Sequence, residues 1–204
     1  LKAYGFPVCN QAVVGVDDDI VAAAKKVGYP LVLKAVGENI VHKSDIGGVI
    51  VGVAGDRDLE DARRRMDESL AAAGVADQVT GYMLQEMARP GKEVILGVAQ
   101  DPNFGPLLMA GMGGKYVEIL RDVQFRVTPV TDVDARDMIQ KIKSYPLLEG
   151  VRGEPRVDIE FIVESIQRLA QFVSEVEGIE ELDMNPVVVT PDRADCRVVD
   201  ARIK

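Results

Sequence analysis

The sequence predicts an α+β protein in which antiparallel or mixed sheets are flanked by helices. Several short segments alternate apolar with other residues as a strand does, for example residues 48–53. Longer segments repeat apolar residues every three or four positions, as one face of a helix does, most clearly over 159–173. Two pairs of predicted strands are joined by short turns, which favours antiparallel pairing over a doubly wound parallel sheet.

The first half of the chain begins with a clear helix signal. Asp17, Asp18 and Asp19 favour a helix start, because carboxylates stabilise the positive end of the helix dipole. Gly28 ends this helix, and Pro30 prevents its return. In order, the predicted elements are a short strand within 4–8, a helix over 20–27, a strand over 31–36, a polar loop over 37–47, a strand over 48–53 and a helix over 58–73.

The second half is predicted to mix hairpins with two helices. Thr131 is a good N-cap for a helix that we expect Pro146 to stop. The other predicted elements are strands over 82–87, 93–98 and 107–110, a helix over 159–173 and a hairpin of 186–190 with 196–200. We expect two lobes, residues 1–86 and residues 87–204, with an approximate boundary where the strands of the second half begin.

Composition excludes several classes of function. The chain has 204 residues, a net charge of -9, 47% hydrophobic and 28% charged residues, which is typical of a folded globular protein. An acidic surface argues against nucleic-acid binding, which needs lysine and arginine at the phosphates. No apolar run reaches the roughly 18 residues of a membrane span. The first residue is Leu1, without a signal peptide or a starting methionine, so we expect part of a longer polypeptide.

The cysteine and histidine content points to a reducing compartment and away from zinc. Cys9 and Cys196 are far apart and lack metal-type spacing, so we expect two thiols in the cytoplasm. One histidine, His42, leaves too few ligands for a zinc site. No G-x-S-x-G nucleophile motif accompanies it.

A lysine interrupts an otherwise apolar strand. Lys34 is costly there unless its ammonium reaches water or an anion. Two interpretations remain open on this feature alone. Lys34 either points to solvent from the edge of a sheet or binds a phosphate.

The loop after that strand gathers reactive and charged side chains. His42, Lys43, Ser44 and Asp45 precede the pair Gly47–Gly48, and glycine lets backbone N–H groups approach a phosphate closely. Imidazole is a nucleophile near neutral pH. A structural histidine and a phosphoryl-transfer residue remain equal alternatives here.

Two further segments carry weaker phosphate or nucleotide signals. Gln85, Glu86 and Met87 end a strand whose backbone groups could pair with an adenine edge, and Glu93 follows; an ordinary hairpin is the alternative. The run 111–114, with Gly111, Gly113 and Gly114, forms a flexible turn followed by Glu118, but it matches neither the Walker nor the dinucleotide pattern.

An asparagine and an aspartate face each other across the predicted last hairpin. Asn185 and Asp200 would lie side by side, since an antiparallel pair returns the chain to its start. Their oxygens suit Mg²⁺, which takes few protein ligands and completes its shell with water and phosphate. A turn asparagine and a surface aspartate form the alternative.

Together and in this order, five motifs resemble those of a known family. They are residues 28–34, 42–48, 85–87, 111–114 and 182–186. The chain is similar over nearly its whole length to the β subunit, or C-terminal ATP-grasp segment, of ADP-forming acetate–CoA ligases and related acyl-CoA synthetases. It is more distantly similar to the β subunit of succinyl-CoA synthetase.

The resemblance implies a two-lobed ATP-grasp fold that binds Mg-ATP and a phosphohistidine mechanism. Acyl-CoA, phosphate and ADP would interconvert with acid, CoA and ATP, and His42 would receive the phosphoryl group before ADP does. By the same resemblance, Lys34 is the nucleotide-binding lysine, Glu86 and Met87 face adenine, Glu93 lies near the nucleotide, and Asn185 and Asp200 bind Mg²⁺. Lys34 and Lys43 could offset phosphate charge.

The sequence lacks parts that this reaction needs. There is no Rossmann-type CoA-binding half and no second histidine to serve as the mobile carrier. We therefore expect a CoA-binding α subunit or fused N-terminal CoA-binding domains as partner. Two alternatives stay open: a regulatory ATP-grasp module of a fused protein acetyltransferase, and an ATP-grasp ligase that joins a carboxylate to an amine.

Overall fold

A computed structural model describes residues 1–37, 40, 43–114 and 121–204. The chain divides into two compact units, which we call the smaller unit, Cys9–Met87, and the larger unit, Leu1–Val8 with Ala88–Lys204. The change of unit after Met87 falls one residue from the boundary expected from the sequence. Residues 1–8, however, pack with the larger unit.

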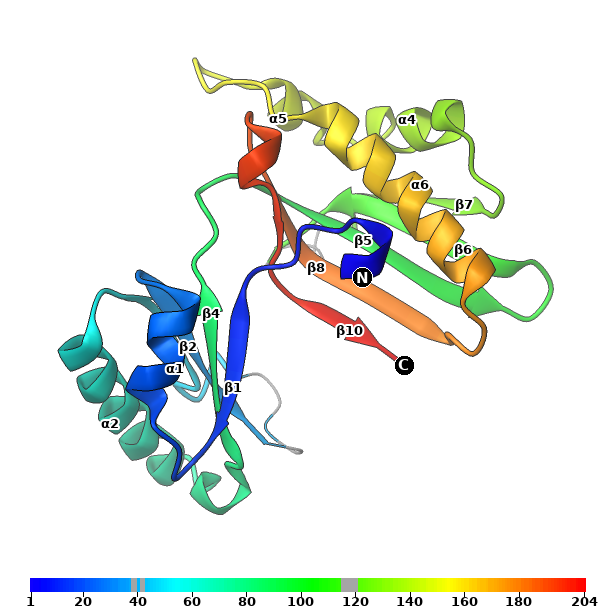
Figure 1. The fold of residues 1–204 in the computed structure, drawn as a ribbon. Helices are drawn as coiled ribbons and strands as arrows, with labels where there is room; N and C mark the ends of the chain where they lie inside the picture. Colours follow the sequence, from blue (N-terminus) through cyan, green and yellow to red (C-terminus); the bar gives the residue numbers. More distant parts are fainter. Residues whose placement is uncertain (38–39, 41–42, 115–120) are drawn as a thin grey trace. The chain divides into compact units, whose positions relative to one another are not determined.

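The smaller unit is a four-stranded antiparallel sheet with helices on one face (Figure 1). Its elements are β1 (Gln11–Gly15), α1 (Ile20–Val27), β2 (Leu31–Val36), β3 (Val49–Val53), α2 (Asp56–Ala72), the 3₁₀ turn η2 (Ala76–Gln78) and β4 (Gly81–Glu86). The strand order is β1-β4-β2-β3. Consequently β2 is an interior strand, and the alternative that Lys34 lies at a sheet edge is wrong.

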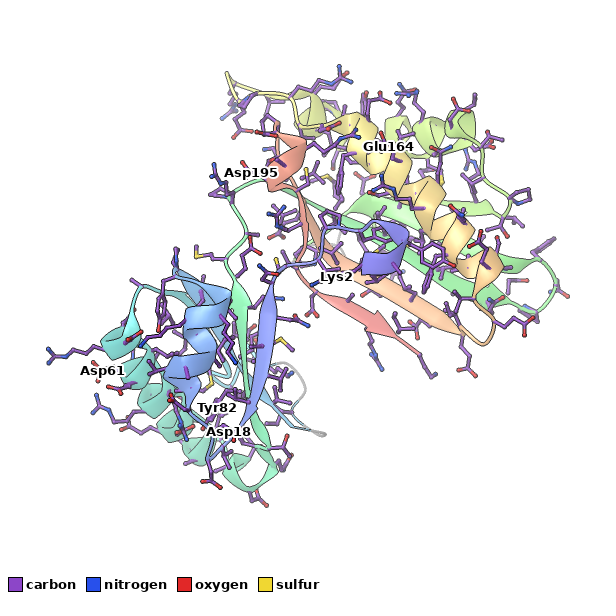
Figure 2. The ribbon with its side chains drawn as sticks, viewed as in Figure 1. Lys2, Asp18, Asp61, Tyr82, Glu164 and Asp195 are labelled. Atoms are coloured by element: carbon purple, nitrogen blue, oxygen red, sulfur yellow. The ribbon has the colours of Figure 1, made fainter. Side chains whose placement is uncertain are left out.

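One face of this sheet holds the core of the smaller unit. Leu31, Leu33 and Ala35 on β2 are fully buried against apolar residues of α2 such as Leu59 and Met66. Tyr82 on β4, labelled in Figure 2, joins them and donates its hydroxyl to Asp67 Oδ1 at 2.5 Å. Because side chains alternate along a strand, the half-buried residues between these positions occupy the opposite face.

The larger unit is built on a second antiparallel sheet, whose strands follow the order β10-β8-β5-β6-β7, with β9 also paired to β8. Its elements are η1 (Lys2–Tyr4), β5 (Lys92–Asp101), β6 (Gly105–Met112), β7 (Val123–Val127), α4 (Asp132–Gln140), α5 (Tyr145–Glu149), α6 (Ile159–Glu175), β8 (Glu181–Val189), η3 (Arg193–Asp195), β9 (Arg197–Val198) and β10 (Ala201–Ile203). The α+β prediction with antiparallel sheets and flanking helices is confirmed.

Helix α6 provides most of the helical side of the larger core. Ile162, Ile166 and Leu169 are each at most 1% exposed, as the predicted apolar repeat requires. The helix starts at Asp158, whose carboxylate accepts a hydrogen bond from the N–H of Phe161 at 2.9 Å. Among the described residues, no helix is both long and apolar enough to cross a membrane.

Several predicted elements differ from the structure at strand edges and at a proline. Strands β1 and β7 were not predicted; both are short edge strands whose exposed valine or phenylalanine gives little alternation. No regular strand forms within residues 4–8, where only Val8 makes an isolated bridge. Pro146 does not stop α4, which ends at Gln140; it lies instead in the first turn of α5, where a missing N–H costs nothing.

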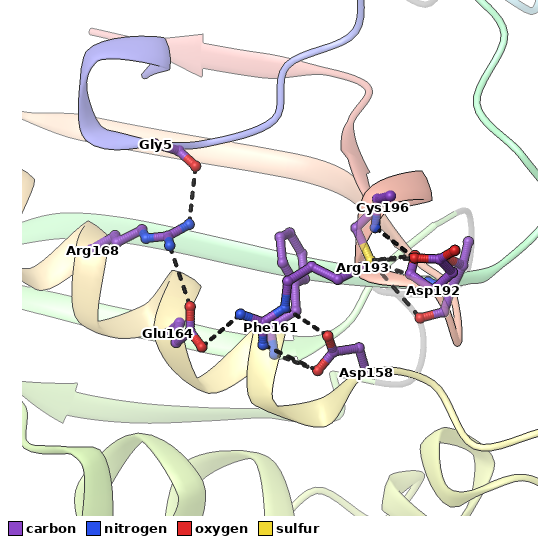
Figure 3. Close-up of polar contacts among 10 residues, drawn as sticks. Gly5, Asp158, Phe161, Glu164, Arg168, Asp192, Arg193 and Cys196 are labelled. Atoms are coloured by element: carbon purple, nitrogen blue, oxygen red, sulfur yellow. Dashed lines mark hydrogen bonds and ion pairs between the residues drawn. The ribbon is translucent and has the colours of Figure 1, made fainter.

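A charged network ties the start of the chain to α6 (Figure 3). Arg193 in η3 donates to Asp158 at 2.7 Å and to Glu164 at 2.8 Å. Glu164 also accepts from Arg168 at 3.2 Å, and Arg168 donates to the carbonyl of Gly5 at 3.0 Å. Together with the burial of Phe6 in the larger core, these contacts attach residues 1–8 to the larger unit.

Candidate functional site

Lys34 occupies the middle of the open face of the smaller sheet. It pairs in register with Met83 on β4 and Val49 on β3, both partly exposed, while its strand neighbours Leu33 and Ala35 are buried on the other face. Lys34 is half-buried on this face. The interior position of β2 excludes the sheet edge, and phosphate binding by Lys34 stays a prediction.

The loop that leads into β3 is held in a compact turn. The N–H of Gly48 donates to the carbonyl of Lys43 at 2.7 Å. Gly47 has a φ of 76°, and a side chain there would come within 3.0 Å of Ser69 on α2. Both glycines thus fit the predicted glycine turn. His42 lies outside the described residues.

The end of β4 is tied to the chain before β1. The N–H of Glu86 donates to the carbonyl of Asn10 at 2.7 Å, and its carboxylate accepts from the N–H of Asn10 at 2.9 Å. Gln85 is buried beside Gln11, with a 3.3 Å hydrogen bond between their amides. Met87, the last residue of the smaller unit, is 38% exposed.

In the larger unit, the glycine turn after β6 lies against two of the predicted site residues. The N–H of Gly113 donates to the carbonyl of Glu93 at 2.9 Å, and the N–H of Gly114 donates to Asn185 Oδ1 at 3.0 Å. A side chain on Gly114, whose φ is 78°, would overlap the Glu93 carboxylate. The structure thus brings together four predicted residues from β5, β8 and this turn.

Gly111 and Glu118 differ from that group. A side chain on Gly111 would overlap the carbonyl of Asp122 and the backbone of Val123, so this glycine permits the close approach of β6 to β7. Glu118 lies outside the described residues. Gly111 therefore has a packing role in the structure, whereas Gly113 and Gly114 donate the hydrogen bonds to Glu93 and Asn185.

Asn185 and Asp200 lie side by side on neighbouring segments of the last hairpin. The N–H of Asn185 donates to the carbonyl of Asp200 at 3.2 Å. Asn185 lies within β8 and is not a turn residue, whereas Asp200 is exposed just before β10. The side-by-side placement expected from hairpin geometry is confirmed.

A carboxylate on the strand of Asn185 was not among the predicted site residues. Asp183 is two positions before Asn185 and so lies on the same face of β8. Burial raises the pKa of Asp183, and the charges of Glu181 and Asp200 raise it further against the opposing effect of Arg202. Because residues two apart on a strand share a face, the motif 182–186 could have predicted from the sequence that Asp183 lies beside Asn185.

The oxygen ligands of this cluster fit a magnesium ion. The Asn185 amide oxygen accepts one hydrogen bond from Gly114 and keeps a second lone pair, and Asp200 contributes a carboxylate. A side chain at Gly113 would overlap the backbone of Val94, and one at Gly114 would overlap the Glu93 carboxylate, so both glycines permit the close approach of the turn to β5. Among the described residues, no group of three or more histidine, cysteine or acidic side chains is placed to hold a metal ion.

Comparison with known proteins identifies the same family over the whole chain. A family model described as an ATP-grasp domain matches residues 1–204. The chain is 46% identical to 4-hydroxybutyrate–CoA ligase (ADP-forming) of Nitrosopumilus maritimus, over 100% of this chain and 29% of that protein. It is 40% identical to the β subunit of acetate–CoA ligase (ADP-forming) II of Pyrococcus furiosus, over 100% of this chain and 86% of the subunit.

Solved structures agree with the sequence relatives. Acetyl-coenzyme A synthetase 1 of Ca. Korarchaeum cryptofilum, in complex with coenzyme A and Ca-AMPCP, has a TM-score of 0.90 and 41% identity, covering 99% of this chain and 87% of that one. A form with coenzyme A and Mg-AMPPCP, whose phosphohistidine segment points towards the nucleotide binding site, has a TM-score of 0.85 and 40% identity, with 99% and 86% coverage. The resemblance and the ATP-grasp fold expected from the motifs are confirmed.

Proposed function

We propose that this chain, which belongs to the ATP-grasp domain family and within it to the β-subunit group of ADP-forming acetate–CoA ligases, is the nucleotide-binding component of an ADP-forming acyl-CoA ligase. The reaction is acyl-CoA + ADP + phosphate = acid + CoA + ATP. The observation that carries the proposal is the cluster of Asn185, Asp200 and the Gly113–Gly114 turn, in a chain that matches such β subunits along its whole length.

The larger unit supplies the metal ligands in this proposal. Asn185 and Asp200 hold Mg²⁺ through one amide and one carboxylate oxygen, and Glu93 lies beside the turn that orients Asn185. When bound, the ion neutralises phosphate charge. The N–H of Gly114 keeps the amide oxygen of Asn185 in place, so that the ligand is oriented before the nucleotide arrives.

The smaller unit supplies phosphate and base contacts. Lys34 binds a phosphate from the open face of its sheet, and Lys43 forms a second phosphate contact. The N–H groups of Gly47 and Gly48 are bonded to the carbonyls of Ser44 and Lys43, so these glycines shape the turn that carries Lys43. Gln85, Glu86 and Met87 face the adenine. Because the carboxylate and N–H of Glu86 are bound to Asn10, we assign the adenine contact to other main-chain groups of this segment.

His42 is the phosphoryl relay in this proposal. Its imidazole accepts the phosphoryl group from a histidine outside this chain and passes it to ADP, so that one long transfer becomes two short steps. The proposal therefore needs a CoA-binding α subunit or fused CoA-binding domains, which also form the acyl phosphate. We place the complete protein in the cytoplasm, where buried thiols such as Cys196 stay reduced.

The test measures ATP formed by the full polypeptide with its CoA-binding partner from acetyl-CoA, phosphate and Mg-ADP. We expect His42→Ala to lower turnover by about 10⁴-fold or more, as loss of a covalent catalytic group does. Mg-ADP affinity, measured by calorimetry, should persist in this variant. Glu177→Gln, an exposed change after α6, should leave both quantities unchanged. Near-normal turnover of His42→Ala would rule out the relay.

A further inference from the structure

A buried carboxylate lies behind the glycine turn, outside every role assigned above. Asp122, just before β7, is only 7% exposed. Its Oδ1 accepts a hydrogen bond from the N–H of Lys143, and its Oδ2 accepts one from the N–H of Ser144, each at 2.7 Å. Lys143 and Ser144 form the bend between α4 and α5. The side chain of Asp122 thus anchors the start of β7 to the helical layer.

The backbone of the same residue holds the end of β6. The carbonyl of Asp122 accepts from the N–H of Met112 at 3.3 Å. Gly111, one residue earlier, allows this approach, because any side chain there would overlap the Asp122 carbonyl. Met112 directly precedes Gly113 and Gly114, so the anchor fixes the point from which the turn departs.

The turn then passes this constraint to a candidate metal ligand. Gly114 lies two residues after Met112, and its N–H donates to Asn185 Oδ1 at 3.0 Å. We propose that Asp122 is a positioning residue that orients Asn185 for Mg²⁺ through Met112 and the Gly113–Gly114 turn. This inference rests on the proposed function, since it assigns Asn185 to the metal.

Two independent features indicate that the contacts of Asp122 hold the backbone around it in a fixed conformation. Arg121 has a φ of 47°, a left-handed conformation that a residue other than glycine keeps only when its surroundings hold it. Burial acts to raise the pKa of Asp122, but hydrogen bonds from Ser144 and from the N–H groups of Lys143 and Ser144 outweigh it, so the pKa is lowered. The ionised carboxylate is therefore the form that fits this site.

The experiment uses the full polypeptide with its CoA-binding partner and measures ADP binding by calorimetry over a Mg²⁺ series and in EDTA. Asp122→Asn replaces one acceptor with an NH₂ group facing N–H donors. We expect the Mg²⁺ concentration for half-maximal ADP binding to rise about 10-fold, as loss of an outer-shell partner does. ADP affinity in EDTA should not change. A merely structural role would not separate these two measurements.

The matched control is Asp134→Asn, because Asp134 also accepts from a main-chain N–H, that of Thr131 at 3.0 Å, at the start of α4. It should leave the Mg²⁺ dependence unchanged. Ser144→Ala removes only the hydroxyl from the anchor and should give a smaller shift in the direction of Asp122→Asn.

The outcomes separate the two hypotheses. If wild type binds Mg-ADP and Asp122→Asn shows the Mg²⁺ dependence of Asp134→Asn, the positioning role is wrong while the proposed function stands. If Asp122→Asn does not fold, an unchanged Mg²⁺ dependence in Ser144→Ala overturns the role. If wild type shows no Mg²⁺-dependent ADP binding, the proposed function fails and this inference fails with it.

Discussion

The main-chain N–H of Asn185 donates to the main-chain carbonyl of Asp200 at 3.2 Å. This single bond places an amide and a carboxylate, 15 residues apart in the sequence numbering, on adjacent segments of one hairpin. Backbone pairing within the larger unit therefore fixes the distance between the two residues. The metal-binding part of the proposed site is therefore built into the sheet itself.

Removing the Asp200 carboxylate should weaken metal-dependent nucleotide binding. We expect Asp200→Ala to lower the affinity for Mg-ADP by about 10-fold or more, because one of two protein ligands to the ion is lost. Calorimetry with and without Mg²⁺ measures this. Glu177→Gln removes a charge at an exposed position after α6 and should bind normally. Unchanged Mg-ADP affinity in Asp200→Ala would remove Asp200 from the metal site.

Two glycines with similar backbone angles allow the effect of a steric overlap to be separated from the effect of a left-handed backbone. Gly114 and Gly178 have similar φ values, 78° and 83°, but a side chain would overlap Glu93 at Gly114 and meet nothing within 4 Å at Gly178. Alanine at either position should cost about 1–2 kcal/mol of stability for the left-handed backbone. Only Gly114→Ala should also weaken Mg-ADP binding, because it displaces Glu93 or Asn185.

Thermal unfolding and calorimetry on both variants decide this point. Equal losses of melting temperature with a binding defect in Gly114→Ala alone would agree with a functional turn. Equal binding by the two variants would mean that the turn is free to move away from Asn185 without consequence.

The sequence predicts the elements with strong periodicity and the pairs that hairpin geometry brings together. Helix α6 and the Asn185–Asp200 pair were predictable, because the first has a long apolar repeat and the second follows from chain return. The short edge strands β1 and β7 were not, since a strand with one neighbour and exposed apolar residues has no distinct pattern.

Two other features depend on contacts that no local pattern encodes. The interior position of β2, which excludes a sheet-edge placement of Lys34, follows from pairing with β4 some 50 residues later. The anchor at Asp122 joins β7 to the bend at Lys143–Ser144, and an aspartate before a strand carries no signal of such a partner. The position of Asp183 beside Asn185, by contrast, was predictable from the sequence, because residues two apart on a strand share a face.

The ionised carboxylate of Asp183 should lower the free energy of unfolding at neutral pH. Its folded-state pKa is raised above 3.8, first by burial and then by Glu181 and Asp200, so the folded state favours the protonated acid. The corresponding stabilisation is present below pH 3.8 and is lost as the pH rises through the folded-state pKa. Asp183→Asn, which stays neutral, should therefore unfold at a higher temperature than wild type near pH 7. The gain should stay below about 1 kcal/mol, because the partly exposed carboxylate is screened.

Melting temperatures measured between pH 3 and pH 7 test this sign. The difference between Asp183→Asn and wild type should shrink towards low pH. Asp134→Asn should show the opposite sign near pH 7, because hydrogen bonds from Thr131 lower the pKa of Asp134. A destabilised Asp183→Asn at neutral pH would contradict the prediction. A stabilised variant with impaired ATP formation would indicate that the carboxylate is kept for function at a cost in stability.

Arg193 should stabilise the larger unit in a pH-dependent way. Its guanidinium joins Asp158 at 2.7 Å and Glu164 at 2.8 Å, and the hydrogen bond from Arg193 is the main reason that the pKa of Asp158 is lowered from 3.8. A lowered acid pKa contributes stability above pH 3.8, which is lost as the pH falls through the folded-state value. Arg193→Met keeps much of the side-chain volume and should lower the melting temperature at pH 7, with little effect near pH 2.

The comparison variant is Arg136→Met, which breaks a two-residue pair between Arg136 and Glu160 at 2.6 Å. Arg193 bridges two acids, and one of them, Glu164, also holds Arg168, whose guanidinium reaches Gly5; loss of Arg193 therefore loosens three segments at once. We expect a larger fall in melting temperature for Arg193→Met than for Arg136→Met, and a smaller gap between them in high salt. Equal falls in both variants would mean that the network acts as separate surface pairs, and that residues 1–8 are held by the packing of Phe6 in the larger core and the bridge of Val8 to Val198 instead.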